Sequence, residues 1–346
     1  MRHDTQRVRQ PAFTLVELLV VISIIALLIS LLLPSLKRAR DQAKAVKCGA
    51  QIHGLGSGLL TYGIENDEWL PGRNTTGLET WIAATPASGA TQRLSRPHVP
   101  VQTYDWMTPI LRVSTTLPAN RAERFRLLLE HYRCPSVNFK ATLYSAPPAP
   151  PDNATFQLDT QQHGAYYGVS YLMPAYFQLW GTLDADEPVG FHPLAPTTIA
   201  LRVDTPSPTW EVTMDRYRSR INKVGTPAEK IAAADGTRYL DERNELDFDH
   251  APNPSYFGAF TSSGGWWRGS VAYGVYPYNK SRGKNIPLSY RHQGGIESLF
   301  FDGHVAFLTE HASRKIDYWY PRGAVVAKAE EGIDAVFDYP NGYTIR

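Results

Sequence analysis

A continuous apolar run near the N-terminus dominates the hydropathy pattern of the chain. From Phe13 to Leu33 the residues are apolar apart from Thr14, two serines and one acid, Glu17. A helix of these residues would be about 31 Å long, close to the ~30 Å hydrocarbon core of a bilayer. A carboxylate within such a segment costs about 2.5–3.5 kcal/mol at the bilayer centre. We therefore expect a transmembrane helix over residues 13–33 in which Glu17 has a function.

Helical periodicity continues beyond this run. Pro34 is expected to kink or interrupt the helix. After it, apolar and small residues recur every three to four positions with charged residues between them, which predicts an amphipathic helix over residues 34–63. The apolar positions are Leu36, Ala39, Ala43, Val46 and Ala50. Several glycines near its end indicate close packing; no strand precedes them and no Lys-Ser/Thr follows, so a phosphate loop is not favoured.

The remainder, residues 64–346, reads as a β-rich globular body. Residues 121–132 form the one convincing helical pattern, and Pro, Gly, Tyr and Trp are frequent elsewhere. Strand-like runs occur at 199–203, 209–214, 271–276 and 296–308. The predicted fold class is α+β: a long, partly transmembrane N-terminal helix packed on a mainly antiparallel body.

The dipeptide Asp302-Gly303 lies between apolar runs and predicts a β-hairpin with a two-residue type I′ turn. His292 precedes Asp302 with nine residues between them. We expect the His292 side chain to hydrogen-bond the Asp302 carboxylate and fix the hairpin. A metal site that includes His304 and a catalytic His–Asp pair are the alternatives, although the sequence shows no recognised nucleophile or zinc-protease motif.

Composition and charge narrow the function classes. The formal net charge is +2, and residues 1–12 account for it with three arginines and one aspartate, so the body is near neutral and gives no reason to expect nucleic acid as a partner. Two cysteines, Cys48 and Cys134, are too few for a disulfide scaffold and do not fit a four-ligand zinc site. One disulfide and two unpaired thiols both remain open.

An acidic stretch at residues 241–249 could offer Asp241, Asp247 and Asp249 as oxygen ligands to Ca²⁺. It lacks the alternation of an EF-hand loop, so a solvated loop is favoured, and we expect no cofactor. The large aromatic body leaves a second class open, an exported enzyme or carbohydrate-binding module that uses the apolar helix as its anchor.

The segment PAFTLVELLVVISIIALL resembles the N-terminus of type IV pilin-like precursors, the prepilins and pseudopilins. The resemblance implies a cytoplasmic leader, residues 1–12, that a prepilin peptidase removes between Ala12 and Phe13 before methylating the new amine. It makes Glu17 the fifth mature residue, which pairs with a neighbouring subunit's N-terminal amine during assembly. Ala12 stands where the family usually has Gly.

The same resemblance places the body outside the inner membrane. The positive-inside count disagrees, because residues 37–47 carry more Lys and Arg than the leader does. We follow the resemblance and expect a single-pass protein of the inner membrane with a periplasmic or extracytoplasmic body.

A second resemblance covers both ends of the body. Cys48, Gln51, Tyr62 and the Leu70-Pro71 pair occur in the order typical of a pilin-like subgroup of Planctomycetes, and residues 292–303 resemble its His-x9-Asp-Gly domain. The middle matches only at Arg133-Cys134-Pro135 and from Lys230 to Asp235. The expected function is structural, as a non-enzymatic subunit assembled with other pilin-like subunits into a type IV pilus or a type II secretion pseudopilus.

Overall fold

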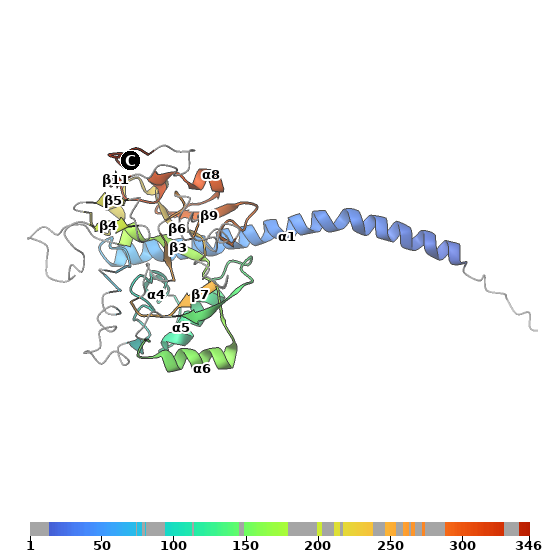
Figure 1. Ribbon diagram of the computed structural model, residues 1–346, viewed down its shortest axis with the longest axis horizontal. Coiled ribbons are helices and arrows are strands. Elements are labelled where there is room, and N and C mark those ends of the chain that lie inside the picture. The colour runs from blue at the N-terminus through green and yellow to red at the C-terminus, as the bar shows by residue number, and fades with distance from the viewer. Residues whose placement is uncertain are drawn as a thin grey trace, which may run out of the picture. The chain divides into compact units, whose positions relative to one another are not determined.

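The fold is taken from a computed structural model (Figure 1). The described residues are 14–73, 75–77, 80, 94–112, 114–144, 149–178, 199–202, 211–214, 217–237, 246–253, 259–262, 264–266, 272–273, 288–328 and 339–346. The chain divides into two compact units, Met1–Ala43 and Lys44–Arg346. Helix α1 (Leu15–Glu65) contributes to both units, which are described separately here.

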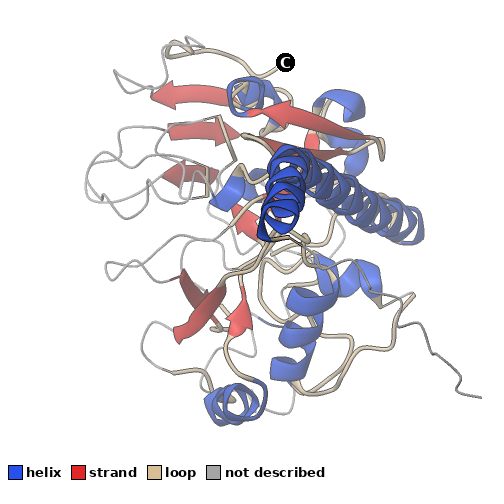
Figure 2. Ribbon diagram, turned by 90° about the vertical axis from the view of Figure 1, so that its right-hand side faces the viewer, coloured by secondary structure: helices blue, strands red, loops and turns tan. Residues whose placement is uncertain are grey.

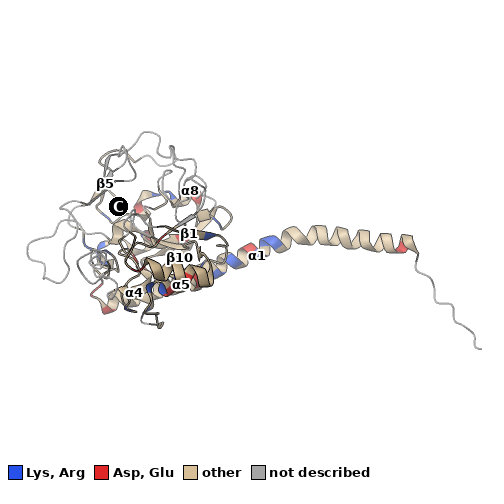
Figure 3. Cartoon of the chain, turned by 60° about the horizontal axis from the view of Figure 1, so that its bottom comes forward, with Lys and Arg blue, Asp and Glu red and all other residues tan. Residues whose placement is uncertain are grey.

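In the first unit α1 is an exposed apolar helix. It is the helix of the described chain that is long and apolar enough to cross a membrane, with a mean hydropathy of 3.0 over its most apolar window. Pro34 lies inside the helix and does not end it. Figure 3 shows one acidic residue at the start of α1, followed by a long uncharged stretch. The hydroxyls of Ser23, Ser30 and Ser35 donate to backbone carbonyls of the same helix, so they need no other partner in an apolar medium.

In the second unit α1 packs against the body with side chains at helical spacing. These buried side chains are Cys48, Ile52, Leu55, Leu59 and Tyr62. The apolar positions of the predicted amphipathic helix, Leu36, Ala39, Ala43, Val46 and Ala50, are all exposed. The buried face includes a cysteine, a tyrosine and glycines. A search for recurring aliphatic residues does not detect these positions.

A five-stranded sheet forms the centre of the body, in the order β10-β9-β6-β3-β8. Its strands are among those drawn in red in Figure 2. Its strands are β3 (Tyr171–Pro174), β6 (Ile231–Asp235), β8 (Thr261–Ser262), β9 (Gly295–Phe300) and β10 (Val305–Thr309). Neighbours are antiparallel except β3 and β8. Strand β6 is buried along its whole length, and its register places Asp235 opposite Tyr171. The sheet therefore carries a carboxylate into the core.

Two three-stranded sheets complete the strands of the described chain, in the orders β2-β1-β7 and β11-β5-β4. They consist of β1 (Lys140–Tyr144), β2 (Tyr166–Tyr167), β7 (Leu246–Asp249), β4 (Ile199–Arg202), β5 (Glu211–Met214) and β11 (Val325–Lys328). Besides α1, the described part of the chain contains the helices α4 (Met107–Leu111), α5 (Arg121–His131), α6 (Asn153–His163) and α8 (Glu310–Ser313). Short 3₁₀ turns lie at Ala175–Gln178, Ile221–Lys223, Pro227–Glu229 and Ile316–Tyr318.

This arrangement confirms the α+β fold class, with a long N-terminal apolar helix and a body of mixed and antiparallel sheets. The helix predicted at 121–132 and the strands predicted at 199–203 and 209–214 correspond to α5, β4 and β5. Most of the run at 271–276 lies outside the described residues. Asn120 caps α5 by accepting the Ala122 amide, which explains where the helix begins.

The predicted hairpin is present as β9 and β10, but its turn differs from the prediction. Gly303 has a φ of 93° and its amide donates to the Phe300 carbonyl, whereas Asp302 does not have positive φ. The connection is therefore a longer loop with glycine in the left-handed region. The paired positive φ values of a type I′ turn occur instead at Gln293 and Gly294, between the bridged residues His292 and Gly295.

Two glycines of α1 test how closely the helix packs on the sheet. A Cβ at position 56 would lie 2.4 Å from Leu299 Cδ1 of β9, whereas one at position 54 would meet nothing within 4 Å. We predict that Gly56→Ala lowers stability by about 1–3 kcal/mol through overpacking. Gly54→Ala should raise it by up to ~1 kcal/mol through helix propensity. Thermal unfolding of the full-length protein in detergent measures both, and equal shifts would contradict this packing.

Candidate functional site

The first candidate site is the beginning of α1. Glu17 Oε2 accepts hydrogen bonds from Thr14 N at 2.9 Å and from Thr14 Oγ1 at 2.7 Å. The Glu17 amide in turn donates to Thr14 Oγ1 at 3.2 Å. This reciprocal pair is a capping box, which satisfies amides that have no partner inside the helix. Glu17 thus has a local structural role that reasoning from hydropathy missed, although the Thr-x-x-Glu spacing is its recognised signal. Ala12 and Phe13 lie outside the described residues.

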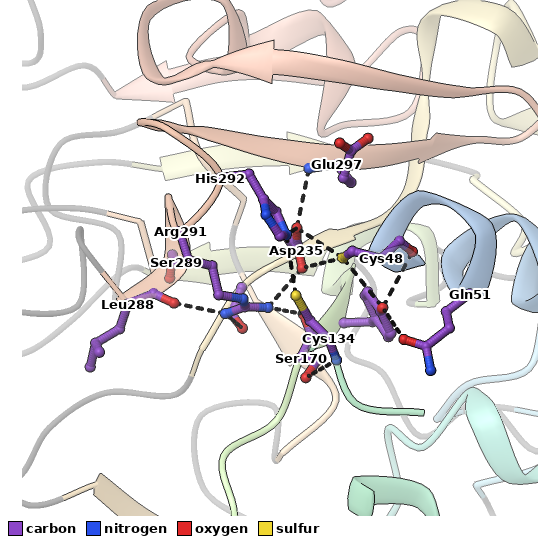
Figure 4. A network of polar contacts seen from close by, with 12 residues as sticks. Cys48, Gln51, Cys134, Ser170, Asp235, Leu288, Ser289, Arg291, His292 and Glu297 are labelled. Carbon is purple, nitrogen blue, oxygen red and sulfur yellow. Dashed lines mark hydrogen bonds and ion pairs between the residues drawn. The ribbon is translucent and has the colours of Figure 1, made fainter. Parts of the chain in front are cut away.

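The second candidate site is a group of four side chains in the interior of the body, here called the buried cluster: Cys48, Cys134, Asp235 and His292. Each offers one metal-ligating atom, and these atoms all lie within 4.8 Å of one another. Figure 4 shows the two sulfurs, the carboxylate and the imidazole converging on one point. All four side chains are buried, and His292, the most exposed, is only 3% exposed.

Four separate parts of the chain supply these residues. Cys48 begins the buried face of α1, and Asp235 ends β6. Cys134 follows α5, where its amide donates to Ser170 Oγ at 3.0 Å. His292 stands before β9, and the tight turn at Gln293-Gly294 sets its position by bridging it to Gly295.

Short contacts connect the four side chains in a row that runs from Cys134 through His292 and Asp235 to Cys48. His292 Nε2 lies 3.1 Å from Asp235 Oδ2 and 3.2 Å from Cys134 Sγ. Cys48 Sγ donates to Asp235 Oδ1 at 3.2 Å and lies 3.3 Å from Oδ2. Both cysteines are free thiols in the structure.

A buried guanidinium that is not part of the buried cluster holds the Asp235 carboxylate. Arg291 Nη2 donates to Asp235 Oδ1 at 2.7 Å and to the Ser170 carbonyl at 2.9 Å, and Nη1 donates to the carbonyls of Gly236 and Leu288. The Glu297 amide adds a longer bond, of 3.3 Å, to Oδ2. Although burial opposes ionisation, the Arg291 charge and these hydrogen bonds keep the pKa of Asp235 below its ordinary value.

The thiols and the imidazole are shifted in opposite directions. Burial raises the pKa of Cys48, whereas the neighbouring Cys48 and His292 side chains lower the pKa of Cys134 despite burial. Burial works against the charged imidazole, but hydrogen bonds to Asp235 and Cys134 raise the pKa of His292 to about 9. Cys134 is therefore the more readily ionised of the two thiols.

The geometry does not support a Cys-His-Asp catalytic triad. In a triad the acid holds one ring nitrogen and the nucleophile uses the other. Here Cys134 Sγ and Asp235 Oδ2 both contact Nε2, and the sulfur is fully buried. The arrangement suits a structural network or a bound cation better than a reaction with a substrate.

The predicted bond between His292 and Asp302 was wrong. The Asp302 carboxylate accepts from His304, through Nδ1 at 2.6 Å and through the amide at 3.1 Å, while His292 turns into the buried cluster. Both members of the His304–Asp302 pair are partly exposed at the hairpin tip. The alternative metal site at His304 is contradicted too, because the structure does not bring His292 to this pair. Gly303 keeps its expected place in the turn.

The weak calcium candidates do not form a described site. Asp241 lies outside the described residues, and Asp247 and Asp249 belong to strand β7 rather than to a solvated loop. Asp249 is buried, and its Oδ1 accepts from the Ala251 amide at 3.0 Å. This carboxylate therefore helps to end a strand.

Comparison with known proteins bears on the first candidate site. Residues 7–33 match the prokaryotic N-terminal methylation motif. No curated protein and no solved structure matches the chain. The methylation motif spans Ala12, Phe13 and Glu17 and supports a prepilin-like precursor that a prepilin peptidase processes and that associates with a membrane. Because Thr14 and Glu17 lie within the motif, the capping box begins two residues after the expected cleavage point.

The two histidines near the hairpin offer a matched pair of substitutions. His292→Ala removes a partner from a buried carboxylate, so we predict a loss of about 3–5 kcal/mol in stability. His304→Ala removes an exposed ion pair and should cost at most ~1 kcal/mol. Thermal unfolding of the detergent-solubilised protein compares them, and a larger shift for His304→Ala would contradict the position of His292 described here.

Proposed function

We propose that the chain is a membrane-anchored structural subunit of the pilin or pseudopilin type. A prepilin peptidase would cut between Ala12 and Phe13 and methylate Phe13, and the apolar part of α1 would then pack with other subunits in a filament. The filament would be a type IV pilus or a type II secretion pseudopilus. The body would lie on the extracytoplasmic side of the inner membrane, anchored by one span.

The observation that carries this proposal is the methylation motif on an unburied helix. The motif covers residues 7–33, and no side chain of the most apolar window of α1 is buried within the chain. A fully exposed apolar helix is unstable in water and requires lipid or other apolar helices around it. Glu17 is the only acidic residue between Phe13 and Leu33. A neighbouring cation would offset the free-energy cost of burying its carboxylate.

The His-x9-Asp-Gly resemblance supports the same assignment. In the structure its histidine belongs to the core of the body and its Asp-Gly pair forms a hairpin tip. Both are positions that shape a body rather than line a cleft. We therefore propose that the protein belongs to the subgroup of pilin-like proteins that combines this domain with the N-terminal motif.

An exported enzyme is the competing class, and the buried cluster bears on it. The titratable residues that converge in this cluster lie in the core rather than at the surface. A described surface pocket is lined by residues such as Tyr217, Lys223 and Arg322, and none of its lining residues is a carboxylate, an imidazole or a thiol. We therefore propose a non-enzymatic role.

N-terminal processing is tested by sequencing the membrane-bound protein. We predict that the mature chain begins with N-methylated Phe13. Ala12→Gly should be processed equally well, whereas Ala12→Leu should accumulate as precursor because it places a large side chain where the family has a small one. Intact mass gives the same readout. An unprocessed Met1 terminus in the presence of an active prepilin peptidase would overturn the proposal.

The role of Glu17 is tested by separating its charge from its capping bonds. A glutamine can still accept from Thr14 N, as Glu17 does, but carries no charge. If Glu17 pairs with a neighbouring amine, Glu17→Gln and Glu17→Ala should both reduce assembly by about tenfold or more while membrane insertion persists. Filament yield and membrane fractionation measure the two effects. Normal assembly of Glu17→Gln would reduce the role of Glu17 to capping.

A further inference from the structure

Four ligating side chains from four distant segments meet in the interior of the body, and neither the methylation motif nor a filament role accounts for them. We propose that the buried cluster binds one structural Zn²⁺ ion, which joins the second half of α1 to the central sheet. The site would be closed, with all four ligands supplied by the protein.

The spacing of the ligand atoms fits a tetrahedral ion. With Zn–S of about 2.3 Å and Zn–N or Zn–O of about 2.0 Å, the edges of the tetrahedron are roughly 3.3–3.8 Å. The contacts of His292 with Asp235 and Cys134, and of Cys48 with Asp235, are 3.1–3.3 Å, and all ligand atoms lie within 4.8 Å of one another. Outward movements of a few tenths of an ångström would therefore admit the ion.

The chemical types of the four ligand atoms favour Zn²⁺ over other divalent ions. Two thiolates, an imidazole and a carboxylate form a set that suits Zn²⁺, whereas Ca²⁺ and Mg²⁺ require oxygen ligands. Four protein ligands that leave no open position are typical of structural zinc sites and not of catalytic ones. This accords with the burial of all four side chains.

A divalent cation would keep the charge balance of the cluster, because it would replace two protons, one on Cys48 Sγ and one on the His292 imidazole. Two thiolates and Asp235 bring three negative charges, and Arg291 returns one positive charge through its 2.7 Å bond to the carboxylate. A divalent ion would neutralise the remaining two charges. Ions are tolerated inside a protein when the charges around them sum to about zero.

A second layer of groups orients the ligands. The Tyr171 hydroxyl lies 3.3 Å from Cys48 Sγ, and Ser170 Oγ accepts the Cys134 amide. Arg291 and the Glu297 amide hold the Asp235 carboxylate. Such outer partners fix the direction of ligand atoms before the metal arrives.

A disulfide between the two cysteines is the principal competitor. It would require the sulfurs to approach to about 2.0 Å. The structure instead has two free thiols, one directed to Asp235 and the other to His292. A disulfide would also leave the imidazole and the carboxylate without their sulfur partners, whereas zinc uses all four groups.

The test uses the full-length protein, purified from membranes in detergent without chelators. Elemental analysis should find about one zinc ion per chain, and both cysteines should react with a thiol reagent once the protein is denatured without reductant. After exchange with Co²⁺, the protein should show the visible absorption of tetrahedral cobalt and thiolate charge-transfer bands. This spectrum identifies the ligands without any substitution.

Substitutions then assign the ligands. Cys134→Ser and His292→Ala should each weaken Zn²⁺ affinity by more than about tenfold, whereas the exposed His304→Ala should retain full occupancy. A chain lighter by two hydrogens, with no reactive thiols and no metal, would replace the proposal with a disulfide. Free thiols that take up neither Zn²⁺ nor Co²⁺ after reduction would leave only a hydrogen-bonded network and would equally overturn it. A folded Cys134→Ser variant with undiminished zinc would also contradict it.

Discussion

A carboxylate placed in the core is the constraint on which the body depends. Asp235 is completely buried at the end of the central strand β6. An unpaired charge there would cost several kcal/mol, so neighbouring segments must bring partners to it. Arg291 and His292 arrive ahead of β9, and Cys48 arrives on α1. Strand order, the approach of the helix and the turn before β9 are therefore linked through one side chain.

The parts of this structure that a local pattern specifies were predictable. The apolar helix follows from an unbroken hydropathy run, α5 follows from its periodicity, and the hairpin follows from Asp-Gly between apolar residues. The turn type was wrong because Asp302 keeps negative φ, while a second glycine turn at Gly294 supplies the type I′ geometry. Local sequence indicated a turn, but the register of two strands determined which turn formed.

The buried cluster could not have been assembled from the sequence in the same way. Each of its residues lies in a segment that the pilin-like resemblance touches, yet Cys48 and His292 are more than two hundred residues apart. The number of cysteines argued against a zinc site in the sequence analysis. The other two proposed ligands, Asp235 and His292, become neighbours only when strands β6 and β9 pair. The acid of the His-x9-Asp-Gly pattern, Asp302, misled the assignment of His292, since hairpin geometry directs that acid to His304.

The position of Cys48 along α1 has a mechanical consequence. Cys48 is the first buried residue of a helix that runs without interruption from Leu15 to Glu65. A pulling force along the helix from its apolar side would load the contacts of this sulfur before those of the leucines that follow. Contacts loaded in this order give way one after another, so a strong contact at the start of the row protects the weaker ones behind it. Evenly spread hydrophobic contacts would give way gradually as the force rises. A directional hydrogen-bonding group at the first buried position of the helix instead resists until the force exceeds a threshold.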